Sequence, residues 1–149
     1  MMRIAALLLL AISSTLIAAP VPKEVKKEEK TEGTWQLESL SAFGRPAGLG
    51  GIQYWTLDAE GYVTTHQTPA PPENAVKHLQ LAFEPKTKAV DYKYTNGNNT
   101  GYPGMYELDG DTLKICCNLK GTGVRPTTVD AGSDVYLWTF KRVKAEAKK

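Results

Sequence analysis

The chain has few of the residues that metal sites, disulfide frameworks and nucleophilic enzymes require. Its 149 residues include two cysteines, Cys116 and Cys117, and two histidines, His66 and His78. Neighbouring residues of a strand point to opposite faces, so a disulfide between Cys116 and Cys117 would distort the peptide that joins them. No second pair of ligands stands at a metal-binding spacing. We therefore expect no disulfide, no metal and no cofactor. The alternation of the strand predicts that Cys117 points inward and Cys116 outward.

The sequence also lacks an excess of charge of either sign. Its formal net charge is +2, and residues 33–143 carry ten Lys or Arg against eleven Asp or Glu. Surfaces that bind nucleic acids are usually basic, and no basic stripe interrupts this balance. The composition therefore argues against a nucleic-acid partner.

Long apolar runs are missing except near the N-terminus. Arg3 is followed by an unbroken apolar run of nine residues, 4–12, and Ala18 and Ala19 offer a small-residue cleavage site. This order is typical of a secretory signal peptide. A membrane span needs ~20 apolar residues, so we favour a cleaved signal over residues 1–19 to an uncleaved anchor. The sequence predicts a secreted or periplasmic protein with no stable membrane span once the signal is removed.

The rest of the chain divides into a linker, one domain and a tail. Residues 20–32 contain four Lys and four Glu, and a linker of this composition cannot bury itself. All thirteen aromatic residues fall between Trp35 and Phe140, which places the core in a single domain over residues 33–143. Residues 144–149 form a short basic tail, which we interpret as a frayed soluble terminus.

Apolar residues alternate with polar ones over short segments that turn residues separate. In residues 104–116, Asp109-Gly110 joins two alternating halves, with Gly110 at the second turn position, where a tight hairpin accepts positive φ. Eight strands are predicted, at 34–41, 53–58, 62–66, 77–84, 89–94, 104–108, 112–118 and 135–143. No long helical pattern separates them. We predict an all-β, antiparallel eight-stranded meander barrel, because closure protects strand edges, with an open sheet or sandwich as the alternative.

Several of these pieces recur in order in a known family. Gly33-Thr34-Trp35 opens the domain, the hairpin of residues 104–116 follows, and Arg125-Pro126 and Phe140-Lys141-Arg142 come after it. Together they resemble an uncharacterised lipocalin-like domain family of secreted planctomycetal proteins, over roughly residues 33–143. The resemblance implies a small lipocalin-like barrel, a bacterial source and no catalytic residues. Cys117 departs from the usual pattern.

The resemblance also implies one specific contact. Lipocalin-like barrels commonly pair a Trp of the first strand with an Arg late in the last strand, which here are Trp35 and Arg142. A guanidinium is attracted to an indole face, and its planar fork can also satisfy nearby carbonyls. We expect the Arg142 guanidinium within ~6 Å of the Trp35 ring, in a structural role at one barrel end. Any binding function is then expected at the opposite end.

The candidate ligand-binding residues face the predicted barrel interior, which in eight-stranded barrels is either filled or holds one small ligand. A hollow barrel would bind a small apolar or amphipathic molecule in a cavity of ~300 Å³ or more, lined by Trp55, Leu81, Tyr92 and Tyr106. A filled barrel would instead be a protein-interaction or envelope-associated module with an exposed apolar patch. Trp138 either fills the barrel, which we favour, or belongs to such a patch.

The sequence offers two candidates for catalysis or metal binding, a cysteine and an acidic cluster, and we favour a structural role for both. Cys116 would need a histidine beside it and a lowered pKa to act as a nucleophile, and the sequence places neither histidine there. Glu107, Asp109 and Asp111 form an acidic cluster, but the turn is too short to wrap a calcium ion. We interpret these residues as a structural cysteine and as turn chemistry, and we predict a protein that is not an enzyme.

Overall fold

The computed structural model describes residues 30–97, 101–120 and 123–144, so the predicted signal peptide and most of the linker and tail lie outside the described residues. Within these residues there are β-strands and no α-helix, and accordingly none of them lies in a helix long and apolar enough to cross a membrane. The strands are β1 (Gly33–Ala42), β2 (Arg45–Pro46), β3 (Tyr54–Leu57), β4 (Tyr62–His66), β5 (Lys77–Glu84), β6 (Ala89–Tyr94), β7 (Gly101–Asp109), β8 (Thr112–Cys117) and β9 (Tyr136–Arg142).

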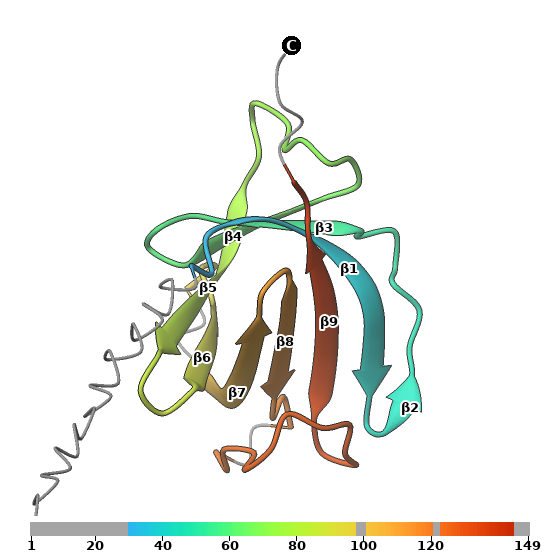
Figure 1. Cartoon of the computed structure of the whole chain (residues 1–149), viewed down its shortest axis with the longest axis vertical. Helices are drawn as coiled ribbons and strands as arrows, with labels where there is room; N and C mark the ends of the chain where they lie inside the picture. Colours follow the sequence, from blue (N-terminus) through green and yellow to red (C-terminus); the bar gives the residue numbers. More distant parts are fainter. Residues whose placement is uncertain (1–29, 98–100, 121–122, 145–149) are drawn as a thin grey trace, which may run out of the picture.

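The strands close into an antiparallel barrel (Figure 1). Strands β1 and β3 to β9 each pair with the next one, and β9 returns to pair with β1, from Trp35 opposite Arg142 to Ala42 opposite Tyr136. The register of this closure shifts between Leu37 and Ser39, as at a β-bulge, which bends the strand. The predicted eight-stranded meander barrel is confirmed, and the alternative of an open sheet is wrong.

Two strand assignments differ from the sequence prediction. The short strand β2 lies in a segment predicted as loop, and it pairs with only Ser41 and Ala42 at the end of β1. Strand β7 begins at Gly101, three residues earlier than predicted, and Tyr102 pairs with Tyr92. Pro103 is tolerated there because it lies at the end of the pairing with β8, where its carbonyl still accepts from the Asn118 N–H at 3.1 Å and only the reciprocal N–H is missing.

Inward side chains fill the middle of the barrel. The Trp55 ring lies 4.8 Å from the Phe140 ring and 5.8 Å from the Trp138 ring, centroid to centroid. Tyr92 stacks on Trp138 at 5.9 Å. Trp138 therefore fills the interior, as favoured. The buried cluster comprises Trp35, Leu37, Trp55, Leu57, Val63, Leu79, Leu81, Val90, Tyr92, Tyr106, Leu108, Leu113, Ile115, Cys117, Trp138 and Phe140.

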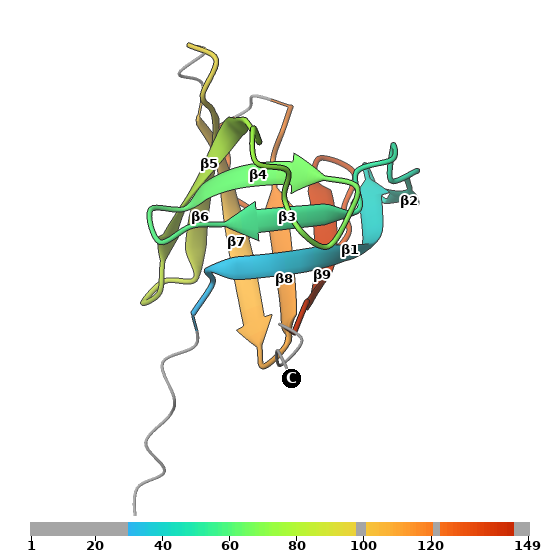
Figure 2. The same cartoon turned by 90° about the horizontal axis from the view of Figure 1, so that it is seen from above.

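The two ends of the barrel differ in their connections. At the tight-turn end, short turns join β3 to β4, β5 to β6 and β7 to β8, and β1 begins and β9 ends there. At the long-loop end lie the connections from β2 to β3, β4 to β5, β6 to β7 and β8 to β9. In Figure 2 the tight turns lie at the left and bottom, and the β4–β5 connection crosses the outer face of β3 and β4. The two ends therefore offer different surfaces to a ligand or partner.

Candidate functional site

A hollow of about 1510 Å³ opens at the tight-turn end of the barrel. We call it the mouth. Its floor consists of inward side chains of β5 and β7, namely Leu81, Phe83, Tyr106 and Leu108. Its rim consists of the three tight turns, the end of β9 and an arm of residues 30–32 that precedes β1. The mouth is open to solvent, so it is a depression in a filled barrel rather than an enclosed cavity.

The four predicted ligand-binding residues are buried, but the structure divides them between two places. Leu81 and Tyr106 lie in the floor of the mouth. Trp55 and Tyr92 instead pack around Trp138 in the middle of the barrel. A single cavity lined by all four residues is therefore not what the structure shows.

The predicted contact between Trp35 and Arg142 is confirmed. The guanidinium carbon of Arg142 lies 4.1 Å from the Trp35 ring centroid, and Trp35 is completely buried. Arg142 also donates hydrogen bonds to the carbonyl oxygens of Glu32, at 2.8 Å, and Lys30, while the indole N–H of Trp35 donates to the Thr31 carbonyl at 2.8 Å. These contacts hold three successive carbonyls of the arm and so form one wall of the mouth.

The mouth lies at the same end as this pair, whereas the sequence argument placed any binding function at the opposite end. The reason is how the interior is filled. Toward the long-loop end, Tyr92 packs edge-on against Tyr94 and Tyr102, with centroids 5.2 and 6.1 Å away. At the tight-turn end, Phe83 and Tyr106 pack edge-on with their centroids 4.8 Å apart and lie beside Leu81 and Leu108 in the floor. The hollow at this end therefore has a mixed aromatic and aliphatic floor.

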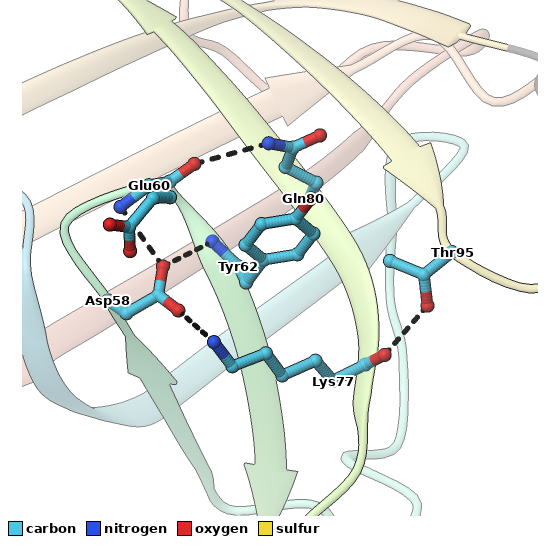
Figure 3. A network of polar contacts seen from close by, with 6 residues as sticks. All are labelled: Asp58, Glu60, Tyr62, Lys77, Gln80 and Thr95. Carbon is cyan, nitrogen blue, oxygen red and sulfur yellow. Dashed lines mark hydrogen bonds and ion pairs between the residues drawn. The ribbon is translucent and has the colours of Figure 1, made fainter.

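The wall between β3 and β5 is built on Asp58 (Figure 3). One carboxylate oxygen of Asp58 accepts hydrogen bonds from the backbone N–H groups of Tyr62, at 2.8 Å, and Glu60, at 3.1 Å. The other accepts from the Lys77 ammonium at 2.5 Å, and this ammonium also lies 5.1 Å from the Tyr62 ring centroid. Although desolvation opposes it, these hydrogen bonds lower the pKa of Asp58. The carboxylate is thus held ionised as part of the wall.

Gly61 brings this wall against β5. Its backbone has φ of +80°, and a Cβ at this position would lie 2.2 Å from the carbonyl oxygen of Leu81. The N–H of Leu81 donates to the Gly61 carbonyl at 2.8 Å. Only glycine allows this close approach, which places the turn directly beside the floor residue Leu81.

The hairpin turn between β7 and β8 completes the rim. Asp109 pairs with Thr112, so the two central turn residues are Gly110 and Asp111, and Gly110 has φ of +54°. Glycine therefore occupies the first central position, as in a type II′ turn, and the predicted second position is wrong by one residue. A hydrogen bond from Lys144 lowers the pKa of Asp111, against a smaller effect of desolvation.

The groups considered for catalysis lie away from the mouth. Cys117 belongs to the barrel core, while Cys116 is buried on the outer face with its Sγ 3.5 Å from the Asp130 carbonyl oxygen, which confirms the predicted orientations. Desolvation raises the pKa of both thiols. The described residues contain no cluster of three or more His, Cys, Asp or Glu side chains placed to hold a metal ion.

Each histidine contacts a threonine rather than a cysteine. His66 is buried beneath the β4–β5 connection, with its Nδ1 at the Thr68 carbonyl and its Nε2 2.9 Å from the Thr56 hydroxyl. A carbonyl can only accept, so Nδ1 donates to it, and in the neutral ring Nε2 accepts from Thr56. His78 Nε2 lies 2.6 Å from the Thr65 hydroxyl. His66 thus holds the β4–β5 connection, and His78 joins β5 to β4.

Sequence reasoning missed several residues of the mouth. Phe83 and Leu108 share the inward face with Leu81 and Tyr106, so strand alternation could have identified both. Lys88, at the end of the β5–β6 turn, carries a positive φ that its sequence neighbours do not signal. The arm belongs to the predicted linker, yet it is held against the barrel through contacts of its backbone carbonyls, which the sequence does not reveal.

No protein-family model matches this chain, and no curated protein or solved structure matches it significantly. The resemblance to a lipocalin-like family therefore stays a prediction from the sequence.

Proposed function

We propose that this protein is an exported, non-catalytic β-barrel that binds a small apolar or amphipathic molecule in the mouth. The observation that carries the proposal is the hollow itself, which combines an apolar floor around Leu81 and Tyr106 with a charged rim. Ligand sites typically combine mostly apolar walls with a few placed polar groups. Its volume of about 1510 Å³ exceeds what a small ligand needs, but much of that space faces solvent.

The openness of the mouth favours an amphipathic ligand. The floor leucines are already packed, and Leu81 has only 1% of its surface exposed. A ligand would therefore bury one side of an apolar chain against Phe83 and the edges of its neighbours. A polar head group would remain at the rim, where water still reaches it.

A binding role is supported over a catalytic one by the state of the ionisable groups. A general acid at neutral pH needs a raised carboxyl pKa, whereas the pKa values of Asp58 and Asp111 at the rim are lowered. A nucleophilic thiol needs a lowered pKa, whereas those of Cys116 and Cys117 are raised.

Export and family membership are part of the same proposal. The N-terminal pattern of residues 1–19 supports a cleaved signal peptide and a secreted or periplasmic location. A closed eight-stranded meander with Trp35 against Arg142 supports a lipocalin-like barrel. No nucleic-acid partner is proposed, because the charges of the domain are balanced.

A second candidate function, a protein-interaction or envelope-associated module, rests on the long-loop end. Large apolar side chains are exposed on its connections, with exposed fractions between 41% for Ile52 and 67% for Val76. Phe43 and Val124 belong to the same set. A filled barrel that presents such residues is what this alternative expects.

Titration of the secreted protein with an uncharged naphthylamine probe tests the main proposal. We expect saturable fluorescence enhancement and backbone amide shifts at Leu81 and Phe83. The variant Phe83→Glu places a charge in the floor and should abolish binding, provided that its circular dichroism matches the parent, while Val76→Glu at the long-loop end should bind normally. Loss of binding in Val76→Glu alone would favour the second candidate, and no saturable binding would overturn the main proposal.

A further inference from the structure

Lys88 has an unusual backbone for its residue type. Its φ is +57°, in the left-handed region that favours glycine, and among the described residues only Phe43 shares this property without being glycine. Its carbonyl accepts a hydrogen bond from the N–H of Tyr106 at 2.9 Å, which ties the turn to β7. Backbone strain of this kind is concentrated at functional sites. The position would suit glycine, yet it carries a long cationic side chain.

The side chain of Lys88 reaches over the floor of the mouth. Its Nζ lies 5.4 Å from the Tyr106 ring centroid, and Tyr106 is a floor residue with 3% of its surface exposed. The attraction between an ammonium and an aromatic face favours this placement. The ammonium therefore stands where the apolar floor meets the rim.

The other cations that line the mouth, Lys30 and Arg142, each have an anionic partner. The arm pairs Lys30 with Glu32 at 3.5 Å, and Asp111 pairs with Lys144 at 3.1 Å. Arg142 directs its donors at the arm carbonyls and at Asp111.

Of the two carboxylates of the β3–β4 turn, Asp58 forms an ion pair with Lys77 at 2.5 Å (Figure 3). Glu60 takes part in no ion pair of the described residues. No ion pair among the described residues includes Lys88. Lys88 is thus the cation of the mouth whose charge is left for a ligand.

We propose that the mouth selects a single-chain amphipathic anion, with its carboxylate on Lys88 and its alkyl chain over Phe83 and Tyr106. This inference rests on the proposed function of the mouth and names its ligand class. A neutral head group would gain less from the ammonium than an anion does, because charge-assisted hydrogen bonds between ions are stronger, and a cationic head group would be repelled by it. The charge of Lys88 therefore provides selectivity, while the floor provides the apolar contact.

Isothermal titration of the secreted protein with matched twelve-carbon probes, each below its micelle concentration, tests the inference. We expect dodecanoate to bind about tenfold more tightly than 1-dodecanol, because a charge-assisted contact is added. Dodecyltrimethylammonium should bind most weakly. The advantage of dodecanoate should shrink as salt is raised, since the rim is exposed to solvent.

The variant Lys88→Met keeps an unbranched side chain, one atom shorter, and removes its charge. We expect its affinity for dodecanoate to fall about tenfold, to the level of 1-dodecanol, whose own binding should not change. Lys86→Met, on the same turn but outside the lining of the mouth, is the matched control and should leave both affinities unchanged.

The outcomes separate the two proposals. Equal binding of dodecanoate and 1-dodecanol, or selectivity that survives in Lys88→Met, overturns the role of Lys88 and leaves the mouth as a binding site for apolar chains. Failure of all three probes to bind overturns the proposed function of the mouth as well.

Discussion

Two residues of the mouth, Gly61 and Lys88, share a left-handed backbone but differ in what surrounds them. Gly61 faces the carbonyl of Leu81 so closely that no side chain fits. Lys88 has room for its side chain, so only its left-handed backbone conformation is unfavourable in free energy. Substitutions at the two positions therefore separate steric exclusion from backbone strain.

Replacing Gly61 by alanine should destabilise the barrel by about 3 kcal/mol or more, because the new Cβ would clash with backbone as well as occupy a strained φ. Gly97→Ala is the matched control, since Gly97 has φ of +87° but nothing within 4 Å of a Cβ, so only strain of about 1 kcal/mol applies. Chemical denaturation of both variants measures the difference. Similar losses in the two variants would show that the β3–β4 turn moves away from β5 without cost.

Replacing Lys88 by glycine should stabilise the protein by about 1 kcal/mol, because the left-handed conformation costs an L-residue roughly that amount. The same variant should lose its preference for dodecanoate. Thermal unfolding of Lys88→Gly beside Lys86→Gly, where no positive φ is relieved, gives the comparison. A lower melting temperature for Lys88→Gly than for Lys86→Gly would contradict the interpretation of Lys88 as a strained residue.

At the scale of elements, the β7–β8 hairpin and the closure of β9 on β1 define the rim. The hairpin turn holds Gly110 at its first central position, and the last paired residues on either side are Asp109 and Thr112. The closure begins at Trp35 and Arg142, where the arm is also held. Each element can be tested at a single residue.

The variant Gly110→Val should lose ~1–2 kcal/mol of stability, since a β-branched residue is strained at positive φ and no neighbour lies within 4 Å to add a clash. Gly110→Asn should lose less, because asparagine tolerates the left-handed region better than other side chains. Urea denaturation midpoints of both variants check this order. An unchanged midpoint for Gly110→Val would show that the turn adopts another type.

The variant Arg142→Ala should lower stability by about 2 kcal/mol, because it removes the stacking on Trp35 and the charge-assisted hydrogen bonds to the arm. Arg142→Lys should be intermediate, since an ammonium lacks the planar fork that holds two carbonyls. Urea denaturation measures the stabilities, and amide exchange at Thr31 and Glu32 reports release of the arm. Equal stability of all three proteins would mean that closure does not depend on this residue.

At the scale of the whole molecule, the described barrel is joined at its tight-turn end to the arm and to the predicted linker. The arm and the end of β9 meet at the mouth, which is lined by residues 30–32 and Arg142.

The mature protein should begin at Ala19 or Pro20, or within a few residues of them, because the apolar run of residues 4–12 ends before a small-residue site. N-terminal sequencing of the exported protein checks this. A variant with Arg in place of Leu9 should stay in the cytoplasm with Met1 or Met2 at its start, because the apolar run is broken. Intact Met1 in a membrane fraction of the parent would contradict cleavage.

Much of the fold could be predicted from the sequence because strand alternation is a local property. The two-residue period assigned Leu81, Tyr106 and Cys117 to the interior and Cys116 to the outer face. It also identified the hairpin around Gly110, although the pairing of Asp109 with Thr112 shifted the turn by one residue. The meander order followed from short turns between consecutive strands.

The sequence alone, therefore, favoured a closed sheet over an open one and determined which side chains share one face of most strands. Only the tertiary structure decided how high each of them lies along the barrel, because that height depends on the registers of all neighbouring strands and on the irregularity after Leu37. For this reason Trp55 and Tyr92 lie in the filled middle while Leu81 and Tyr106 lie in the mouth. The position of Lys88 over Tyr106 likewise depends on a backbone torsion and a distant strand.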